Sequence, residues 1–214
     1  MIERARPFVL AASALTVVTL LSGCVGPAAL TPDSPASEES FAQAKAANLE
    51  FKAAVAEVQG QIYAGEWRVE EYGDIPNVCD DGYQFSLQRR LPTEFSFHDR
   101  GPATMEQLRS WLTENGWQVE PARSYGPSVT DISIEARNLG AGVALLGVDL
   151  SPGFAAELSA DVLELRATST CHSGDSAALL DQLRGPLTAG PDDDGIPDLE
   201  SPDATPLFER FAEG

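Results

Sequence analysis

The hydrophobic pattern of this chain changes its period near Gly65, and this change limits the fold more than any other feature. Upstream, apolar residues recur every three or four positions, as on one side of a helix. These residues are Phe41, Ala44, Phe51, Val55, Val58 and Ile62, with the polar Asn48 in the same stripe. Downstream, apolar and polar residues alternate over Trp67 to Glu70 and over Tyr83 to Gln88, as in half-buried strands. The sequence therefore predicts a long helix followed by a sheet.

The long helix has a recognisable start. Ser37 can cap it, and Glu38 and Glu39 follow in its first turn, where carboxylates interact well with unpaired amides. The stripe also fits a coiled coil in which Asn48 sets the register, but it lasts only about three heptads. Packing against the chain's own sheet is the favoured interpretation.

Two shorter helices are expected later in the chain. Thr104-Met105-Glu106-Gln107 has the form of a capping box, and Asn115-Gly116 supplies a stop. The inner face of this helix would consist of Met105, Leu108, Trp111 and Leu112. A closing helix is expected over 175–184, with Ala178, Leu179 and Leu183 facing inward.

The remaining alternating segments predict an antiparallel meander. They begin at Trp117 and Val119 and continue through 132–136, 146–150 and 163–171. Phe95 and Phe97 would extend the strand that begins at Tyr83, and a bulge is expected between Val162 and Leu163. On the last strand, Cys171 would point inward and His172 outward. Residues 38–185 thus predict an α+β domain: an antiparallel sheet of five to seven strands with two or three helices on one face.

The N-terminal segment has the layout of a secretory signal. Arg4 and Arg6 precede fifteen uncharged residues, from Pro7 to Leu21. This run is shorter than the ~20 residues that a membrane-spanning helix needs, and Gly23 interrupts it.

The end of that segment, Leu21-Ser22-Gly23-Cys24, resembles the lipobox of bacterial lipoproteins. The resemblance implies that residues 1–23 are a signal peptide and that Cys24 receives a diacylglyceryl anchor on the extracytoplasmic face of the cell membrane. An ordinary cysteine near a cleavage site is the alternative. Residues 24–37 then form the lipidated cysteine and a proline-rich tether.

Acidic residues dominate the rest of the chain. Removal of residues 1–23 takes away Glu3, Arg4 and Arg6, which leaves 32 acidic and 12 basic side chains and a net charge of −20. Such a charge argues against nucleic acid as a partner and against lying flat on anionic lipid. Residues 186–214 hold eight acidic residues against Arg210 alone. They predict a disordered acidic tail, with docking of Leu207, Phe208 and Phe211 as the alternative.

Cys79 and Cys171 form an even pair once Cys24 is assigned to lipid. In an exported chain such a pair predicts a disulfide. The bridge would close a loop of 92 residues and contribute about 2 to 4 kcal/mol of stability.

Few residues suggest catalysis or metal binding. Cys171 beside His172 is the one nucleophile arrangement, but neighbours on a strand point to opposite faces. Asp192 to Asp198 resembles part of a calcium-binding repeat, yet its first ligand position falls on Gly190, which favours a solvated linker. Two histidines and no Cys-x-x-Cys argue against zinc, and no glycine-rich loop supports phosphate binding. No metal or other cofactor is predicted.

In order, the chain is similar to the LppA-like lipoproteins of actinobacteria. The matching features are the lipobox at Cys24, the helix that follows, Trp67, the Cys79-Asp80 pair, the middle helix and a late strand that ends in Thr170-Cys171. The resemblance implies an exported, lipid-anchored domain in a cell-wall environment and carries over no activity.

Two functional hypotheses follow. The leading one is a non-enzymatic lipoprotein that presents a binding or structural surface to a cell-wall or protein partner. The alternative is a small extracytoplasmic hydrolase or ligand-binding enzyme with a site near His98 and His172. A pocket that joins these histidines to Asp80 or Asp81 would favour the enzyme.

Overall fold

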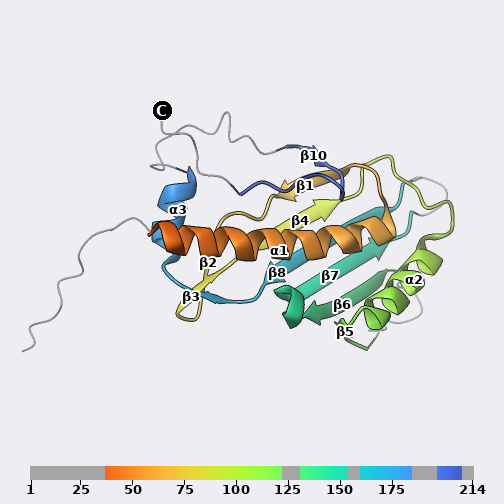
Figure 1. The fold of residues 1–214 in the computed structure, drawn as a ribbon. Coiled ribbons are helices and arrows are strands. Elements are labelled where there is room, and N and C mark those ends of the chain that lie inside the picture. Colours follow the sequence, from red (N-terminus) through yellow and green to blue (C-terminus); the bar gives the residue numbers. More distant parts are fainter. Residues whose placement is uncertain (1–36, 122–130, 154–159, 185–196, 209–214) are drawn as a thin grey trace, which may run out of the picture. The chain divides into compact units, whose positions relative to one another are not determined.

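The computed structural model describes residues 37–121, 131–153, 160–184 and 197–208 (Figure 1). The expected signal peptide, Cys24, most of the tether and the calcium-like stretch before Pro197 lie outside these ranges. Within them the chain has the predicted α+β fold, with three α-helices, a seven-stranded antiparallel sheet and a second sheet of three strands. No helix in the described ranges is both long enough and apolar enough to cross a membrane.

The first helix, α1 (Glu38–Ile62), begins where the sequence places its cap. The Ser37 hydroxyl accepts a hydrogen bond from the Ser40 amide at 3.1 Å. The predicted stripe is buried along the whole helix, Asn48 included. It packs on the chain's own core, so the favoured interpretation of this helix is confirmed.

The strands of the main sheet stand in the order β10-β1-β4-β8-β7-β6-β5, and each neighbouring pair is antiparallel. Their bounds are Trp67–Glu71 (β1), Ser86–Arg90 (β4), Gln118–Val119 (β5), Ile132–Asn138 (β6), Val143–Ser151 (β7), Val162–Ser169 (β8) and Leu199–Glu200 (β10). A single turn of 3₁₀ helix, Leu139–Ala141, joins β6 to β7. α1 and the middle helix, α2, cover one face, where their apolar residues and the inward residues of the strands form one core (Figure 1).

The helix α2 (Gly101–Glu114) starts earlier than the capping-box pattern predicts. Its N-cap residue is Arg100, and the Thr104 hydroxyl donates back to the Arg100 carbonyl at 3.1 Å instead of capping a helix. Pro102 lies in the first turn, where its fixed φ favours a helix and its missing N–H leaves no bond unmade. The end is as predicted, with Gly116 at φ +81°. The inner face is also confirmed: Met105, Leu108 and Leu112 are buried, and Trp111 is partly buried.

Two expectations about strands are wrong. Phe95 and Phe97 lie in the turns between β4 and α2, because the chain leaves the sheet before Pro92, and their rings pack edge to face. There is also no bulge at Val162. It pairs with Ser151 in a regular register, and its apolar side chain simply points outward, 57% exposed.

The second sheet brings the two cysteines together. Its strands are β2 (Asn77–Cys79), β3 (Gly82–Gln84) and β9 (His172–Ser173), in that order. The predicted disulfide between Cys79 and Cys171 is confirmed, with the Cα atoms 6.0 Å apart. Gly82 permits the pairing of β3 with β9, because a Cβ there would lie 1.9 Å from the His172 carbonyl oxygen.

The closing helix, α3 (Ser176–Arg184), agrees with the sequence pattern. The Asp175 carboxylate accepts hydrogen bonds from the Ala177 and Ala178 amides and so caps the helix. The residues expected to face inward, Ala178, Leu179 and Leu183, are all buried.

The expected disorder of the acidic tail is wrong for residues 197–208, which we call the C-terminal strap. Its residues Leu199 and Glu200 form β10 beside β1. Phe208 is only 1% exposed and packs between the rings of Phe41 and Phe85. Burial of this one aromatic ring and the strand pairing outweigh the acidic composition. Leu207 remains 43% exposed, and Phe211 lies outside the described residues.

Candidate functional site

The outward side chains of β4, β8, β7 and β6 form a polar surface on the sheet face opposite the helices. Because side chains alternate along a strand, residues in register form rows across the sheet. One row consists of Arg90, Glu164, Asp149 and Ser133, and the next consists of Gln88, Arg166, Gly147 and Glu135. We call the surface formed by these eight residues the polar face.

A chain of hydrogen bonds crosses the polar face from β4 to β6. Arg90 Nε donates to Glu164 Oε2 at 2.8 Å, and Arg166 Nε lies 3.1 Å from Glu164 Oε1. Arg166 Nη2 then donates to Asp149 Oδ2 at 2.8 Å, and Ser133 Oγ donates to Asp149 Oδ1 at 2.5 Å. Glu164 and Arg166, two residues apart on the outward face of β8, thus pair as part of a larger network.

Arg166 holds this network together. Asp149 and Glu164 are directly opposite each other in the register, and like charges in that position repel. The Arg166 guanidinium contacts both carboxylates, and its path toward Asp149 passes Gly147, which has no side chain to obstruct it. The hydrogen bond to Asp149 and the charge of Glu164 raise the pKa of Arg166.

A shallow groove of about 700 Å³ runs over this network. It is lined by Gln88, Arg90, Asp131, Ser133, Asp149, Ser151, Val162, Glu164 and Arg166. The described residues of the lining therefore offer two guanidinium groups, three carboxylates and neutral hydrogen-bonding groups, but no aromatic ring. A ligand in this groove would meet charges of both signs within a few ångströms.

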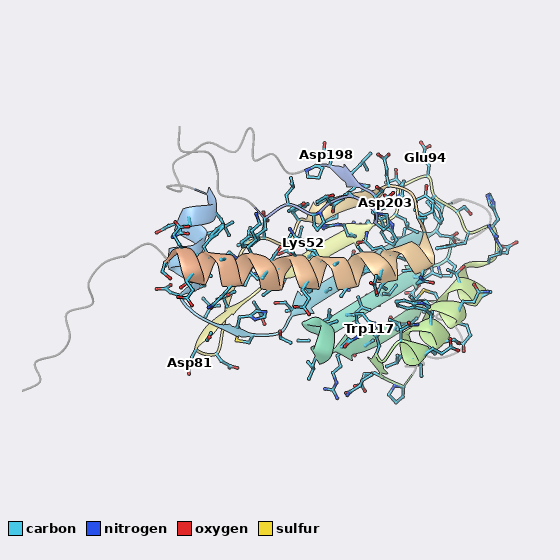
Figure 2. All side chains as sticks on the ribbon, in the orientation of Figure 1. Lys52, Asp81, Glu94, Trp117, Asp198 and Asp203 are labelled. Carbon is cyan, nitrogen blue, oxygen red and sulfur yellow. A yellow bond between two sulfur atoms is a disulfide. The ribbon has the colours of Figure 1, made fainter. Side chains whose placement is uncertain are left out.

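A second polar cluster lies between α1 and the C-terminal strap. It consists of Lys52, Tyr72, Arg89 and Glu200, which we call the strap cluster. Lys52 projects from α1 toward the side where the strap carries Asp198 and Asp203 (Figure 2). Arg89 is 2% exposed; its Nη2 donates to Glu200 Oε2 at 2.9 Å.

Burial of Lys52 and Arg89 in the strap cluster carries a desolvation cost in free energy. Lys52 is 4% exposed; its Nζ donates to the Leu207 carbonyl at 2.8 Å and lies 3.7 Å from the centre of the Tyr72 ring. Burial lowers the pKa of Lys52 to about 8, although the charge of Asp74 acts in the opposite direction. Burial also lowers the pKa of Arg89, against the effect of Glu200.

The strap cluster was not predicted, although part of it left a signal in the sequence. Arg89 has the same parity as Phe85 and Leu87, so the alternation of that strand already directs it inward. Lys52 follows Phe51 on α1, and nothing in the sequence pattern indicated that its side chain would be buried. Its partners, Tyr72 and Leu207, are distant in sequence.

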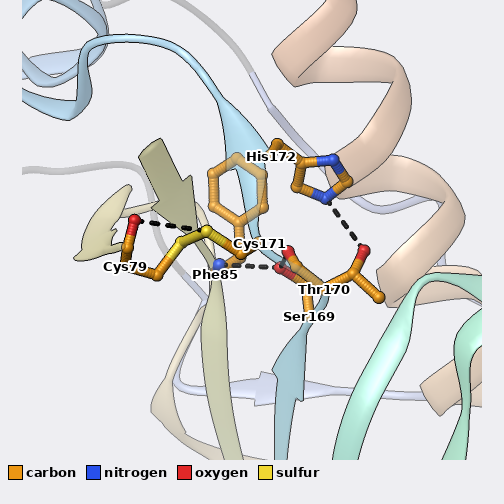
Figure 3. Close-up of a disulfide and its surroundings, with 6 residues drawn as sticks. All are labelled: Cys79, Phe85, Ser169, Thr170, Cys171 and His172. Atoms are coloured by element: carbon orange, nitrogen blue, oxygen red, sulfur yellow. Dashed lines mark hydrogen bonds between the residues drawn. A yellow bond between two sulfur atoms is a disulfide. The ribbon is translucent and has the colours of Figure 1, made fainter. Parts of the chain in front are cut away.

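The disulfide lies beside the second histidine, His172 (Figure 3). Cys171 is exposed and His172 is partly buried against the Tyr83 and Phe85 rings, so the inward and outward directions expected if the last strand reached these residues are not observed. The reason is that β8 ends at Ser169, whose hydroxyl accepts a hydrogen bond from the Phe85 amide at 2.9 Å. The bridge leaves Cys171 without the thiol that a nucleophile needs.

The residues of the enzyme hypothesis are not brought together. His172 belongs to the second sheet, whereas His98 precedes α2 at the other end of the domain (Figure 1). Asp80 and Asp81 form the turn between β2 and β3, and β3 pairs with the strand that carries His172. Figure 2 shows Asp81 in this turn. Neither histidine lines the groove on the polar face or the cavity beneath the strap. Burial lowers the pKa of His172, and the charge of Glu50 partly offsets this shift.

The described part of the chain holds no group of three or more histidine, cysteine or carboxylate side chains placed to bind a metal ion. Comparison with protein-family models, with curated proteins and with solved structures finds no match to this chain. The two polar clusters are therefore interpreted from their own geometry.

Proposed function

We propose that this chain is an exported lipoprotein, anchored through Cys24 to the outer side of the cell membrane, and that it binds its partner through the polar face without catalysis. The N-terminal pattern that ends in Leu21-Ser22-Gly23-Cys24 supports the location. The observation that carries the binding role is the groove over a network of paired charges on β4, β8, β7 and β6.

The pairing of these charges favours binding over catalysis. Each carboxylate of the Arg90–Glu164–Arg166–Asp149 chain already accepts from a guanidinium. Both oxygens of Glu164 and of Asp149 are in contact with a guanidinium or with the Ser133 hydroxyl, so these carboxylates hold the arginine side chains in place. Fixed, preorganised charges are what a binding surface requires.

The groove fits a ligand that carries both an amine and a carboxylate. Arg90 can bind a carboxylate through the end of its guanidinium that Glu164 does not occupy, and Asp131 can accept from an ammonium. The described residues of the groove's lining include no aromatic ring on which a sugar could stack. Together with the cell-wall environment implied by the resemblance, this chemistry selects the peptide part of the cell wall as the partner.

The binding proposal is tested by titrating the mature chain, with Cys24→Ser, with soluble cell-wall fragments. Fragments that carry their peptide should shift the amide resonances of Gly147 and its neighbours, and the same glycan without peptide should not. Arg90→Gln should weaken the shift, whereas Arg68→Gln should not. Arg68 lies on β1, outside the groove, and pairs with Glu70 at 3.2 Å. Shifts confined to α1, or none at all, would remove the polar face as the binding surface.

The location is tested separately by metabolic labelling with a fatty-acid analogue. Cys24→Ala should abolish labelling and leave the chain unprocessed or released, because the thiol is the attachment point of the proposed anchor. Equal labelling of both proteins would contradict the lipoprotein assignment.

A further inference from the structure

The C-terminal strap is held by the rest of the domain in the way that a peptide is held by a receptor. Its backbone pairs with the edge strand β1, with Trp67 opposite Glu200 and Arg68 opposite Leu199. The Val69 amide also donates to the Asp198 carbonyl at 2.9 Å. Addition of a strand to a sheet edge is a common mode of peptide recognition.

Three side chains of the domain body then recognise particular groups of the strap. Arg89 binds the Glu200 carboxylate. The Tyr72 hydroxyl accepts from the Leu207 amide at 2.7 Å, and Lys52 donates to the Leu207 carbonyl at 2.8 Å. Beyond these contacts, the Phe208 ring fills an apolar pocket beside Phe41 and Phe85. The site thus recognises an extended backbone, an acidic side chain and, eight residues later, an aromatic one.

Stability alone is a poor explanation for these polar groups. A buried ion pair can often be replaced by apolar residues without loss of stability, because the desolvation of the charges offsets their attraction. Lys52 and Arg89 both carry this desolvation cost. Their contribution is specificity for an acidic segment that crosses α1 at this point.

The strap also fills its site incompletely. A cavity of about 300 Å³ remains between it and the body, lined on the body side by Lys52, Gln59 and Arg89 and on the strap side by Glu200 and Ala204 among others. Gln59 is 6% exposed and lines this cavity. The buried Arg89 Nε has no partner within the described ranges. An occupant with a larger polar side chain than Ala204 would fill more of this cavity and place a hydrogen-bonding group beside Gln59 and Arg89, which line it.

We propose that the groove between α1 and β1 is a binding site for an extended acidic peptide of another protein, and that this chain's own strap occupies the site until such a peptide displaces it. This site is separate from the polar face and does not rest on the function proposed for that face. The preferred peptide carries an acidic residue in the place of Glu200, an aromatic residue in the place of Phe208, and a hydrogen-bonding side chain between them.

The length of the connection explains how the strap can occupy the site and still be displaced. Twelve residues, 185–196, join α3 to the strap. A short connection gives an effective concentration on the order of millimolar. The strap then remains bound even if its affinity as a free peptide is only about 100 µM, and a partner peptide with a lower Kd can compete.

The experiment uses the full chain with a site-specific protease sequence placed within residues 185–196. The protein is folded and then cut, so that the strap stays in place as a separate peptide. A fluorescent peptide with the sequence of residues 197–214 should exchange into the cut protein, as measured by anisotropy. It should bind the uncut protein at least about tenfold more weakly, because the tethered strap competes.

Peptide variants test which contacts carry recognition. Glu200→Lys and Phe208→Ala should each weaken binding to the cut protein by about tenfold or more. Asp203→Asn is the matched control, since Asp203 is exposed and accepts from Ser201 of the strap itself. A peptide with Ala204→Gln should bind at least as tightly as the native sequence. Lys52→Met in the protein should weaken the native peptide if the domain recognises the strap backbone.

Three results would overturn the proposal. Unfolding of the protein once the cut strap dissociates would make the strap part of the core. Binding that is insensitive to both Glu200→Lys and Phe208→Ala would remove the recognition described above. Concentration-dependent dimers of the uncut protein that exchange straps would make a second copy of this chain, and not another protein, the occupant.

Discussion

Arg166 on the polar face and Arg89 beneath the strap each bridge to a carboxylate on another strand, but their surroundings are opposite. The Arg166 side chain is 60% exposed and has two carboxylate partners. Arg89 is 2% exposed and has one carboxylate partner, Glu200, together with the carbonyls of Glu71 and Tyr72. Water can replace any partner that Arg166 loses, whereas Arg89 depends on the folded position of each of its partners.

The comparison shows that the two charged regions differ in how much their ion pairs contribute to stability. Exposed ion pairs contribute about 0 to 1 kcal/mol each, so the polar face can change in sequence with little cost to folding. Loss of one partner from a buried pair costs about 3 to 5 kcal/mol. Arg89 therefore depends on a bound acidic segment such as the strap, whereas the polar face tolerates changes in sequence at little cost to stability.

The largest expected effect is that of Arg89→Met. The substitution leaves the Glu200 carboxylate and the carbonyls of Glu71 and Tyr72 without their donor, so the free energy of unfolding should fall by about 3 to 5 kcal/mol. Urea denaturation measures this change. The double variant Arg89→Met with Glu200→Leu should recover part of the loss, and a single-variant loss below about 1 kcal/mol would place Arg89 in the same class as Arg166.

Removal of the disulfide should lower the free energy of unfolding of the whole domain, independently of the charged residues in either region. Replacing Cys79 and Cys171 by serine should lower the free energy of unfolding by about 2 to 4 kcal/mol, because the unfolded chain regains the freedom of a large loop. Since the bridge acts on the unfolded state, the loss should be the same in the Arg166→Gln background and in the wild type. Thiol titration of the denatured, unreduced mature chain with Cys24→Ser should find no free thiol. Two thiols per chain would show that the bridge does not form.

The stability of the strap cluster should depend on pH in the alkaline range. Burial lowers the pKa of Lys52 to about 8, so the unfolded chain binds the extra proton more tightly. The free energy of unfolding should therefore rise from about pH 8 toward pH 10, by an amount on the order of 1 kcal/mol. Above about pH 10 the free energy of unfolding should fall, because burial raises the pKa of Tyr72 to about 12 and the unfolded chain loses that phenol proton first.

Denaturation series at several pH values test this dependence. Lys52→Met should remove the rise between pH 8 and pH 10. Lys45→Met, on the same helix, should retain it. A flat profile in the wild type would show that the Lys52 ammonium is as well solvated as a surface lysine.

The smallest expected effect is that of Arg166→Gln on the polar face. Asp149 and Glu164 would then repel each other across β7 and β8, but water screens the repulsion. The loss of stability should stay below about 1 kcal/mol and should shrink further in high salt. A loss as large as that of Arg89→Met would mean that the polar face is a structural element.

The sequence predicted best what local periodicity determines. The stripe on α1 and the inward residues of β6 to β8 follow from periods of 3.6 and 2, because one face of each element must be buried. The disulfide between Cys79 and Cys171 was predicted from the even number of remaining cysteines and from the expected export of the chain. The directions of Cys171 and His172 were not predicted correctly, because β8 ends at Ser169, where the Ser169 hydroxyl accepts from the Phe85 amide.

The strap cluster could not be predicted because its contacts are distant in sequence. Lys52 and Leu207 are 155 residues apart, and Arg89 and Glu200 are 111 apart. Composition predicted disorder for the whole acidic tail. The strap is nevertheless ordered, because the Phe208 ring is buried in the core. The alternation along β8 places Glu164 and Arg166 on one face, but the register that adds Asp149 and Arg90 to the polar face exists only once the sheet is formed.

The position of the disulfide along the chain has a mechanical consequence. The covalent loop between Cys79 and Cys171 contains β4 and β6 to β8, while α1 and β1 precede it and the strap follows it. Tension applied through the two ends of the chain can straighten only the segments outside the loop. Under such a load α1 and the strap can unravel, but the central strands cannot be drawn out to their full length until a reductant opens the bridge.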